Sequence, residues 1–175
     1  MKRDFVSLTP QEALHVAIFI EERNADIYHQ FAEMFAEFRD PESLEIASTF
    51  WDMANEERRH GTMLQKAYFD RYGTQPCAIT EEDITDFIEV PQMHNGEIFT
   101  FSRLKAGRSP RQMALEIALN AEQSALRFYT RLLGTTEDDQ MRAMYRELSN
   151  FEAEHSDFLE KKLAEARRTT GGARA

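Results

Sequence analysis

Apolar residues recur at intervals of three or four along residues 9–39, a pattern that predicts one long amphipathic helix. Thr9 can cap its start, Pro10 suits the first turn, and Glu12 completes a capping box. Glu21 lies in the middle of the apolar stripe, where an apolar side chain is expected. The stripe consists of Leu14, Ala17, Glu21, Ala25, Tyr28, Ala32 and Phe35.

A second helix is predicted from Pro41 to Tyr72, because Asp40 can cap its start and Gly73 suits the position after its end. The proline disfavours helical geometry at Asp40, so the first helix ends there. A connection this short makes the two helices antiparallel neighbours. The stripe of the second helix reads Ala47, Phe50, Ala54, Glu57, Gly61, Leu64 and Tyr68, with His60 beside it.

Residues 73–108 differ from the helices on either side because prolines and glycines interrupt them. One short helix is predicted within 80–88, and residues 98–101 alternate weakly, as a strand would. A connection of this length suits a crossover that runs along a helical bundle.

Two further helices follow the crossover. Ser109 caps the third, which ends near Gly134, and we expect Thr136 to cap the fourth. The bundle domain is predicted to span 1–168, and the small, polar tail 169–175 is predicted to be disordered. The third stripe holds Leu115, Ala118, Glu122, Ala125, Tyr129 and Leu132; the fourth holds Met141, Met144, Leu148, Glu152, His155, Leu159 and Leu163.

The two halves of the chain repeat a pattern of polar residues on these stripes. Glu21 precedes Tyr28 by seven residues, as Glu122 precedes Tyr129, and a Glu-x-x-His pair follows each on the next helix. Residues three apart lie on one face of a helix, so each pair places a carboxylate beside an imidazole. The predicted metal ligands are Glu21, Glu57, His60, Glu122, Glu152 and His155. Tyr28 and Tyr129 either donate hydrogen bonds to a ligand on a neighbouring helix or are ordinary core tyrosines.

Neighbouring candidates fit the metal site less well. Glu12 and His15 share the spacing, but Glu12 has its capping role, and neither His29 nor His94 has a glutamate three residues before it. Three further glutamates lie about 100° from a stripe residue and are expected to face solvent: Glu22, Glu56 and Glu154.

Composition narrows the class of protein. The net charge of −10 argues against nucleic-acid binding, and no apolar run reaches the length of a membrane span. The single Cys77 cannot form an internal disulfide, so a cytoplasmic location is expected.

Four buried carboxylates would destabilise a core unless cations neutralise them, and two divalent cations carry the matching charge. Oxygen and nitrogen ligands without thiolate suit Fe or Mn.

Two helical hairpins, one long crossover, and the ligand order Glu, Glu-x-x-His, Glu, Glu-x-x-His resemble the ferritin-like di-iron carboxylate proteins of the rubrerythrin type. The segment 63–73 is most similar to the ferritin-like domain of erythrins, also called membrane-bound ferritins. The resemblance implies an all-α, antiparallel four-helix bundle that binds two Fe ions, with Mn or Zn able to substitute. It further implies that Glu57 and Glu152 bridge the metals and that Glu21 and Glu122 are terminal ligands. The chain departs from rubrerythrins at Ala125, where they carry a further glutamate, and in its single cysteine, which cannot build their rubredoxin module.

Two function classes follow from this resemblance. One is an oxidoreductase that oxidises Fe(II) with O2 or hydrogen peroxide and uses an electron donor that the sequence does not reveal. The alternative is a module that stores or delivers iron without significant turnover. A homodimer is expected, because the first helix is apolar over an arc wider than one bundle face needs. Ile20, Ile27, Phe31 and Phe38 on this arc require cover from the crossover, a partner subunit or both.

Overall fold

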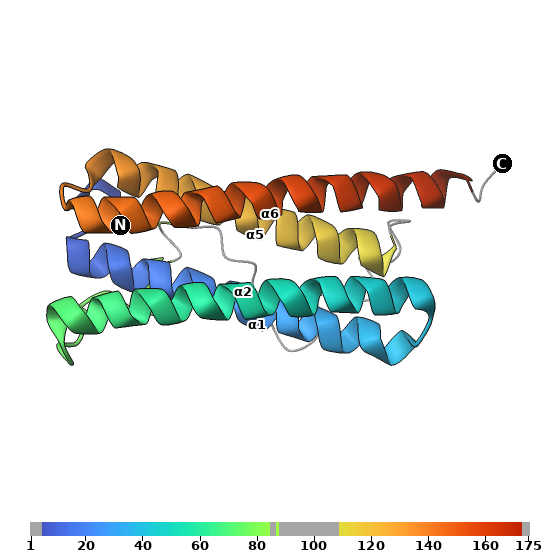
Figure 1. The fold of residues 1–175 in the computed structure, drawn as a ribbon, viewed down its shortest axis with the longest axis horizontal. Helices are drawn as coiled ribbons and strands as arrows, with labels where there is room; N and C mark the ends of the chain where they lie inside the picture. The colour runs from blue at the N-terminus through green and yellow to red at the C-terminus, as the bar shows by residue number, and fades with distance from the viewer. Residues whose placement is uncertain (1–4, 85–86, 88–108, 173–175) are drawn as a thin grey trace.

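The computed structural model describes residues 5–84, 87 and 109–172 (Figure 1). Four long helices run side by side in two antiparallel hairpins, and no strand occurs in these residues, so the predicted all-α, ferritin-like bundle is confirmed. The elements are η1 (Phe5–Ser7), α1 (Pro10–Phe38), α2 (Pro41–Tyr72), α3 (Glu81–Ile84), α5 (Pro110–Thr135) and α6 (Asp139–Gly172).

The first hairpin begins and ends at the residues that the sequence indicated. The Thr9 side chain accepts from the Glu12 amide at 3.2 Å, and the Glu12 carboxylate accepts from the Thr9 amide at 2.9 Å. Arg39 closes α1 in the left-handed region at φ 58°, and Asp40 then caps α2 by accepting from the Ser43 amide at 2.9 Å. Gly73 ends α2 at φ 60°, where glycine avoids the strain that a side chain would add.

The second hairpin differs from expectation at its turn. Thr136 does not cap α6: its amide donates to the Leu132 carbonyl and so belongs to the end of α5. Asp138, the residue directly before α6, caps that helix, and its carboxylate accepts from the Met141 amide at 2.8 Å. The helix α6 continues to Gly172, into the segment 169–175 that we expected to be disordered.

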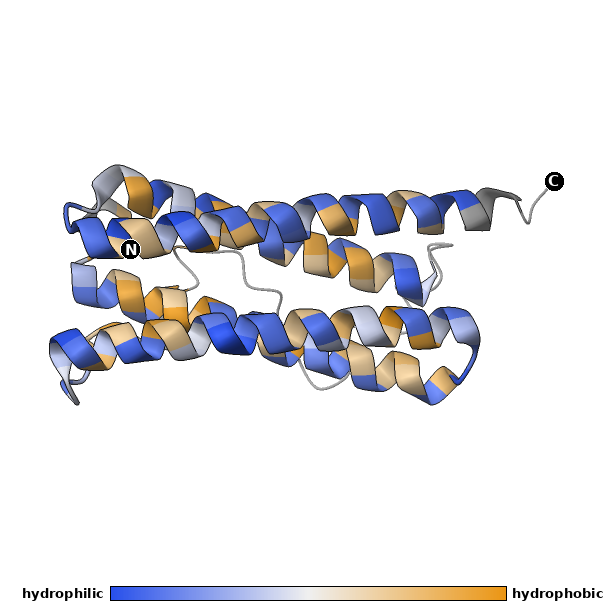
Figure 2. Cartoon of the chain, in the orientation of Figure 1, coloured by the Kyte–Doolittle hydropathy of each residue, from blue (hydrophilic) through white to orange (hydrophobic). Residues whose placement is uncertain are grey.

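The interior consists of two apolar clusters separated along the helix axes by a polar layer. One cluster contains Leu14, Leu64, Tyr129 and Leu148; the other contains Ile27, Phe50, Leu115 and Leu159. On each long helix, the predicted ligands lie between the part in one cluster and the part in the other. Figure 2 shows that hydrophilic residues dominate the outward sides of α2 and α6. The helices are therefore held together by apolar packing on both sides of the polar layer.

The wide apolar arc of α1 is mostly covered within the chain. Ile20, Ile27 and Phe31 are 3%, 0% and 1% exposed, whereas Phe38 remains 58% exposed. This arc therefore does not by itself require a partner subunit.

The crossover contains the expected short helix as α3, while His94 and the strand-like segment 98–101 lie outside the described residues. Among the described helices, none is long and apolar enough to cross a membrane.

Candidate metal centre

The structure brings the six predicted ligands together in the polar layer at the middle of the bundle. Each long helix contributes: Glu21 from α1, Glu57 and His60 from α2, Glu122 from α5, and Glu152 and His155 from α6. All four glutamates are fully buried at 0% exposure, and the side chains of His60 and His155 are 10% and 12% exposed. Burial of four carboxylates in one small volume is unfavourable unless something compensates their charge.

The cluster consists of two overlapping groups. Glu21, Glu57, His60 and Glu152 each offer one ligand atom within 4.8 Å of the others, and Glu57, Glu122, Glu152 and His155 do the same. Glu57 and Glu152 belong to both groups. One group thus contains His60 and the other His155, with the two shared carboxylates between them.

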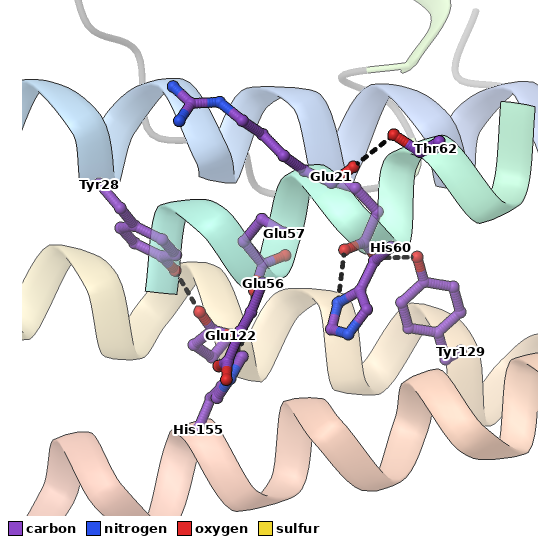
Figure 3. Close-up of polar contacts among 10 residues, drawn as sticks. Glu21, Tyr28, Glu56, Glu57, His60, Thr62, Glu122, Tyr129 and His155 are labelled. Atoms are coloured by element: carbon purple, nitrogen blue, oxygen red, sulfur yellow. Dashed lines mark hydrogen bonds and ion pairs between the residues drawn. The ribbon is translucent and has the colours of Figure 1, made fainter. Parts of the chain in front are cut away.

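Figure 3 shows the His60 imidazole directed at the Glu21 carboxylate. His60 Nδ1 lies 3.3 Å from Glu21 Oε2, and His155 Nδ1 lies 3.3 Å from Glu57 Oε1 and 3.4 Å from Glu122 Oε2. In the described part of the chain, no lysine or arginine nitrogen pairs with these four carboxylates. Among the described residues, His60 and His155 are therefore the only basic side chains that contact these carboxylates.

The inward atoms of the cluster lack hydrogen-bond partners among the described residues, although buried polar atoms in proteins are normally paired. They are Oε2 of Glu21 and Glu122, both carboxylate oxygens of Glu57 and Glu152, and Nδ1 of His60 and His155. These unpaired atoms are the donor set of a metal site: oxygen and imidazole nitrogen, without thiolate, which suits iron or manganese. The residues therefore fit a site for divalent metal ions.

Two buried tyrosines form hydrogen bonds with one carboxylate oxygen each of Glu122 and Glu21. The Tyr28 hydroxyl donates to Glu122 Oε1, and the Tyr129 hydroxyl donates to Glu21 Oε1 (Figure 3). Each bond joins α1 to α5, so each tyrosine reaches the glutamate of the opposite hairpin. With Oε1 held in this way, Oε2 of both glutamates is left facing the cluster.

Burial and the charges of neighbouring groups shift the pKa values of the carboxyl groups in the cluster. Burial, followed by the charges of Glu21 and Glu122, raises the pKa of Glu57 well above its usual range. Burial and the charges of Glu122 and Glu57 do the same to the pKa of Glu152. Burial acts to raise the pKa of Glu122, but the close approach of Glu152 and His155 and the hydrogen bond from Tyr28 outweigh it, so the pKa is lowered. The metal-free site therefore holds protons that a cation would displace.

The pKa of His155 shifts in the opposite direction to that of an isolated buried imidazole. Burial lowers its pKa, but the close contacts of Nδ1 with the Glu122 and Glu57 carboxylates outweigh that effect and raise the pKa to about 11. For both tyrosines, burial and the nearby carboxylate charges raise the pKa well above 10, so their hydroxyls remain protonated donors.

Sequence reasoning missed one residue that contacts the site. Glu56, which we expected to face solvent, is 45% exposed, and its Oε2 lies 2.8 Å from Nε2 of His155 on the facing helix. No feature of the sequence distinguishes Glu56 from the other charged residues of α2, because the contact depends on the distance between α2 and α6. Glu22 and Glu154 are exposed, as expected.

His15, His29 and one cavity at an end of the bundle lie apart from the cluster. The His29 ring packs edge-on against Trp51 with centroids 4.6 Å apart, and its Nε2 lies 3.4 Å from Glu33. The His15 ring lies 6.2 Å from that of Tyr68. A cavity of about 530 Å³ at one end of the bundle is lined by Leu14, Leu132 and Tyr145, among others, and by none of the six ligand residues.

Comparison with known proteins agrees with this geometry. A hypothetical protein from Pyrococcus furiosus has a similar structure, with a TM-score of 0.70 and 18% sequence identity over 94% of each chain, which shows a shared fold. No curated protein matches the chain. The model of the Rubrerythrin family matches residues 12–163, a span that includes all six clustered ligands. The chain therefore belongs to the Rubrerythrin family.

Proposed function

We propose that this protein binds two iron ions in the polar layer and oxidises Fe(II) with O2 or hydrogen peroxide. The observation that carries the proposal is the overlap of two four-residue groups that share Glu57 and Glu152. A single ion would leave one histidine and one terminal glutamate without a partner, whereas two ions use every inward atom. Four carboxylates also carry the charge that two divalent ions neutralise.

The roles of the residues follow from their place in the two groups. Glu57 and Glu152 would bridge the ions; Glu21 and His60 would complete one position, and Glu122 and His155 the other. Tyr28 and Tyr129 orient the terminal carboxylates by holding their outer oxygens. Full burial of the glutamates restricts water around them, which strengthens electrostatic interactions in the site. Two ferrous ions supply two electrons when bound, the number that reduces one hydrogen peroxide to two waters with two protons.

Ala125 supports a site with room for an oxidant. It lies one turn after Glu122 on α5 and is 1% exposed. Its methyl group offers no ligand where rubrerythrins carry a further carboxylate. The chain therefore supplies no further carboxylate at this position, and a ligand position not filled by protein is what a reaction with O2 or peroxide requires.

Anaerobic Fe(II) titration followed by stopped-flow mixing with O2 or hydrogen peroxide tests the proposal. We expect Fe(II) binding to saturate at two irons per chain. We expect the bound Fe(II) to be oxidised within the first turnover. Glu57→Ala should abolish binding at both positions, because it removes a shared carboxylate. Glu154→Ala is the matched control, since this exposed residue lies two positions from Glu152.

The outcomes separate the two function classes. If the protein binds two irons but oxidises them no faster than free Fe(II) is oxidised, it is a storage or delivery protein and not an enzyme. Equal loss of binding in Glu57→Ala and Glu154→Ala would instead indicate a diffuse acidic surface and overturn the buried site.

We place this chemistry in the cytoplasm, a proposal that rests on the single Cys77.

A further inference from the structure

The two halves of the metal centre differ at one position of the internal repeat. Glu56 precedes Glu57 on α2, and Phe151 precedes Glu152 on α6, so the two residues occupy equivalent places in the two Glu-x-x-His motifs. Each contacts the histidine of the other motif: Glu56 contacts His155, and Phe151 contacts His60. A carboxylate in one half thus corresponds to a phenyl ring in the other.

Glu56 contacts the nitrogen of His155 that points away from the cluster. Its Oε2 lies 2.8 Å from Nε2, while Nδ1 of the same ring faces Glu57 and Glu122 at 3.3 and 3.4 Å. A neutral imidazole carries one proton, and the nitrogen without the proton is the metal ligand. A carboxylate at Nε2 keeps the proton there, leaves the Nδ1 lone pair directed into the site and makes the ligand more basic.

His60 receives a different kind of support. Its ring stacks on Phe151 with centroids 4.8 Å apart and an interplanar angle of 29°, and its Nδ1 lies 3.3 Å from Glu21 Oε2. Stacking restrains the plane of the imidazole but offers no acceptor for a proton at Nε2. Within the described ranges, no carboxylate bonds to that nitrogen.

We propose that Glu56 is a positioning residue that makes the two metal positions unequal. The position with Glu122 and His155 binds first and more tightly, and the position with Glu21 and His60 binds second. The negative charge of Glu56 adds to the effect, because it lies close to one cation and farther from the other. The inference rests on the proposed two-metal site. Loss of such an outer hydrogen-bond partner typically weakens metal binding by roughly 10- to 100-fold.

Stepwise titration of the metal-free full-length protein with Co²⁺, followed by calorimetry, measures both affinities without any turnover. We expect two resolved steps, with a first dissociation constant at least about 10-fold below the second. Glu56→Ala should weaken binding at the position of Glu122 and His155 by roughly 10- to 100-fold and leave the position of Glu21 and His60 within a few-fold, so the separation between the two steps should be lost or their order reversed. Glu56→Gln keeps an acceptor oxygen and should restore most of the difference. Because Glu56 is 45% exposed, neither substitution disturbs the apolar core.

The reciprocal substitution makes the test symmetrical. Phe151→Glu places a carboxylate beside His60, at the position that Glu56 occupies beside His155, and should tighten the second step selectively. Phe151 is 36% exposed, so a charged side chain can be solvated there. Glu154→Ala, on the exposed face of the same helix, should change neither step.

Nitrogen-15 NMR of the histidine side chains in the Zn²⁺-loaded protein provides a second readout that does not depend on affinity. The Nε2 proton of His155 should exchange slowly with water in the wild type and in Glu56→Gln, and rapidly in Glu56→Ala. A purely structural role for Glu56 would leave this exchange unchanged. Two equal Co²⁺ steps in the wild type, or an unaltered first step in Glu56→Ala, would overturn the inference alone. Failure to bind two ions at all would overturn the proposed metal site as well.

Discussion

In the metal-free protein, the free energy of unfolding should decrease as pH rises from about 5 to 8. Burial and neighbouring charges raise the pKa of Glu57 and Glu152 in the folded chain, whereas in the unfolded chain both ionise near pH 4.3. Above pH 4.3 the folded state therefore binds more protons than the unfolded state, so stability falls with rising pH until the folded carboxyls ionise. His155, with its pKa raised to about 11, contributes in the same direction above pH 6.5. The lowered pKa of Glu122 affects the free energy of unfolding only below about pH 4.3, where this carboxyl becomes protonated in the unfolded chain. It therefore does not contribute between pH 5 and 8.

Glu57 alone accounts for a large share of this slope. A carboxyl that stays protonated in the folded state contributes up to about 1.4 kcal/mol per pH unit. For a domain of 175 residues, 1 kcal/mol shifts Tm by roughly 2–4 °C, so Glu57 alone should lower Tm by about 3–6 °C per pH unit. Glu57→Gln cannot ionise and should remove this share of the slope. Its Tm should exceed that of the wild type by a margin that grows with pH.

Thermal unfolding followed by circular dichroism in EDTA, between pH 5.5 and 8, measures these slopes. Glu154→Gln is the control and should follow the wild type, since residue 154 is exposed. A metal-free Tm that rises over this interval, or parallel curves for wild type and Glu57→Gln, would refute the assignment of Glu57 as a buried, uncompensated acid. Metal-loaded protein should show the opposite slope, because protons compete with cations for the same oxygens.

Three further predictions concern metal, orientation and assembly. Two divalent ions per chain should raise Tm at pH 7, and elemental analysis that finds no more than one metal in the reconstituted protein would contradict the paired site. Tyr129→Phe and Tyr28→Phe each remove one hydrogen bond to a terminal carboxylate and should weaken metal binding by roughly 10-fold at the position of Glu21 or Glu122, respectively; equal weakening of both steps by either variant would argue against separate terminal ligands. The protein should sediment as a homodimer, in which exposed aromatic residues such as Trp51 and Phe158 become protected from solvent; a monomer mass that does not change with concentration would exclude it.

The helices could be predicted because their signals are local. Thr9 with Glu12, Asp40 with Pro41, and Ser109 with Pro110 set the starts of α1, α2 and α5, since a capping side chain bonds to amides only a few residues away. The same reasoning was wrong for α6, where Thr136 and Asp138 are both capable caps. Their competition depends on where α5 ends, and that end depends on how the hairpin packs.

The candidate ligands were identifiable because a helix converts spacing into direction. Glu57 with His60, and Glu152 with His155, each lie three residues apart on a face that is otherwise apolar, and Glu21 and Glu122 interrupt two further apolar faces. A charged residue on such a face must be compensated from another helix. The sequence by itself thus determined a four-helix fold and a polar layer of defined composition.

Only the tertiary structure decided how these residues pair. The bonds from Tyr28 to Glu122 and from Tyr129 to Glu21 cross between hairpins, and periodicity along one helix carries no information about another helix's height or rotation. The contact of Glu56 with His155 is the clearest case, because a residue assigned to solvent by its angle on α2 lies within hydrogen-bond distance of α6. A side chain on the flank of a helix faces water or a neighbour according to the spacing of two helices, and that spacing is set by the packing of the whole bundle.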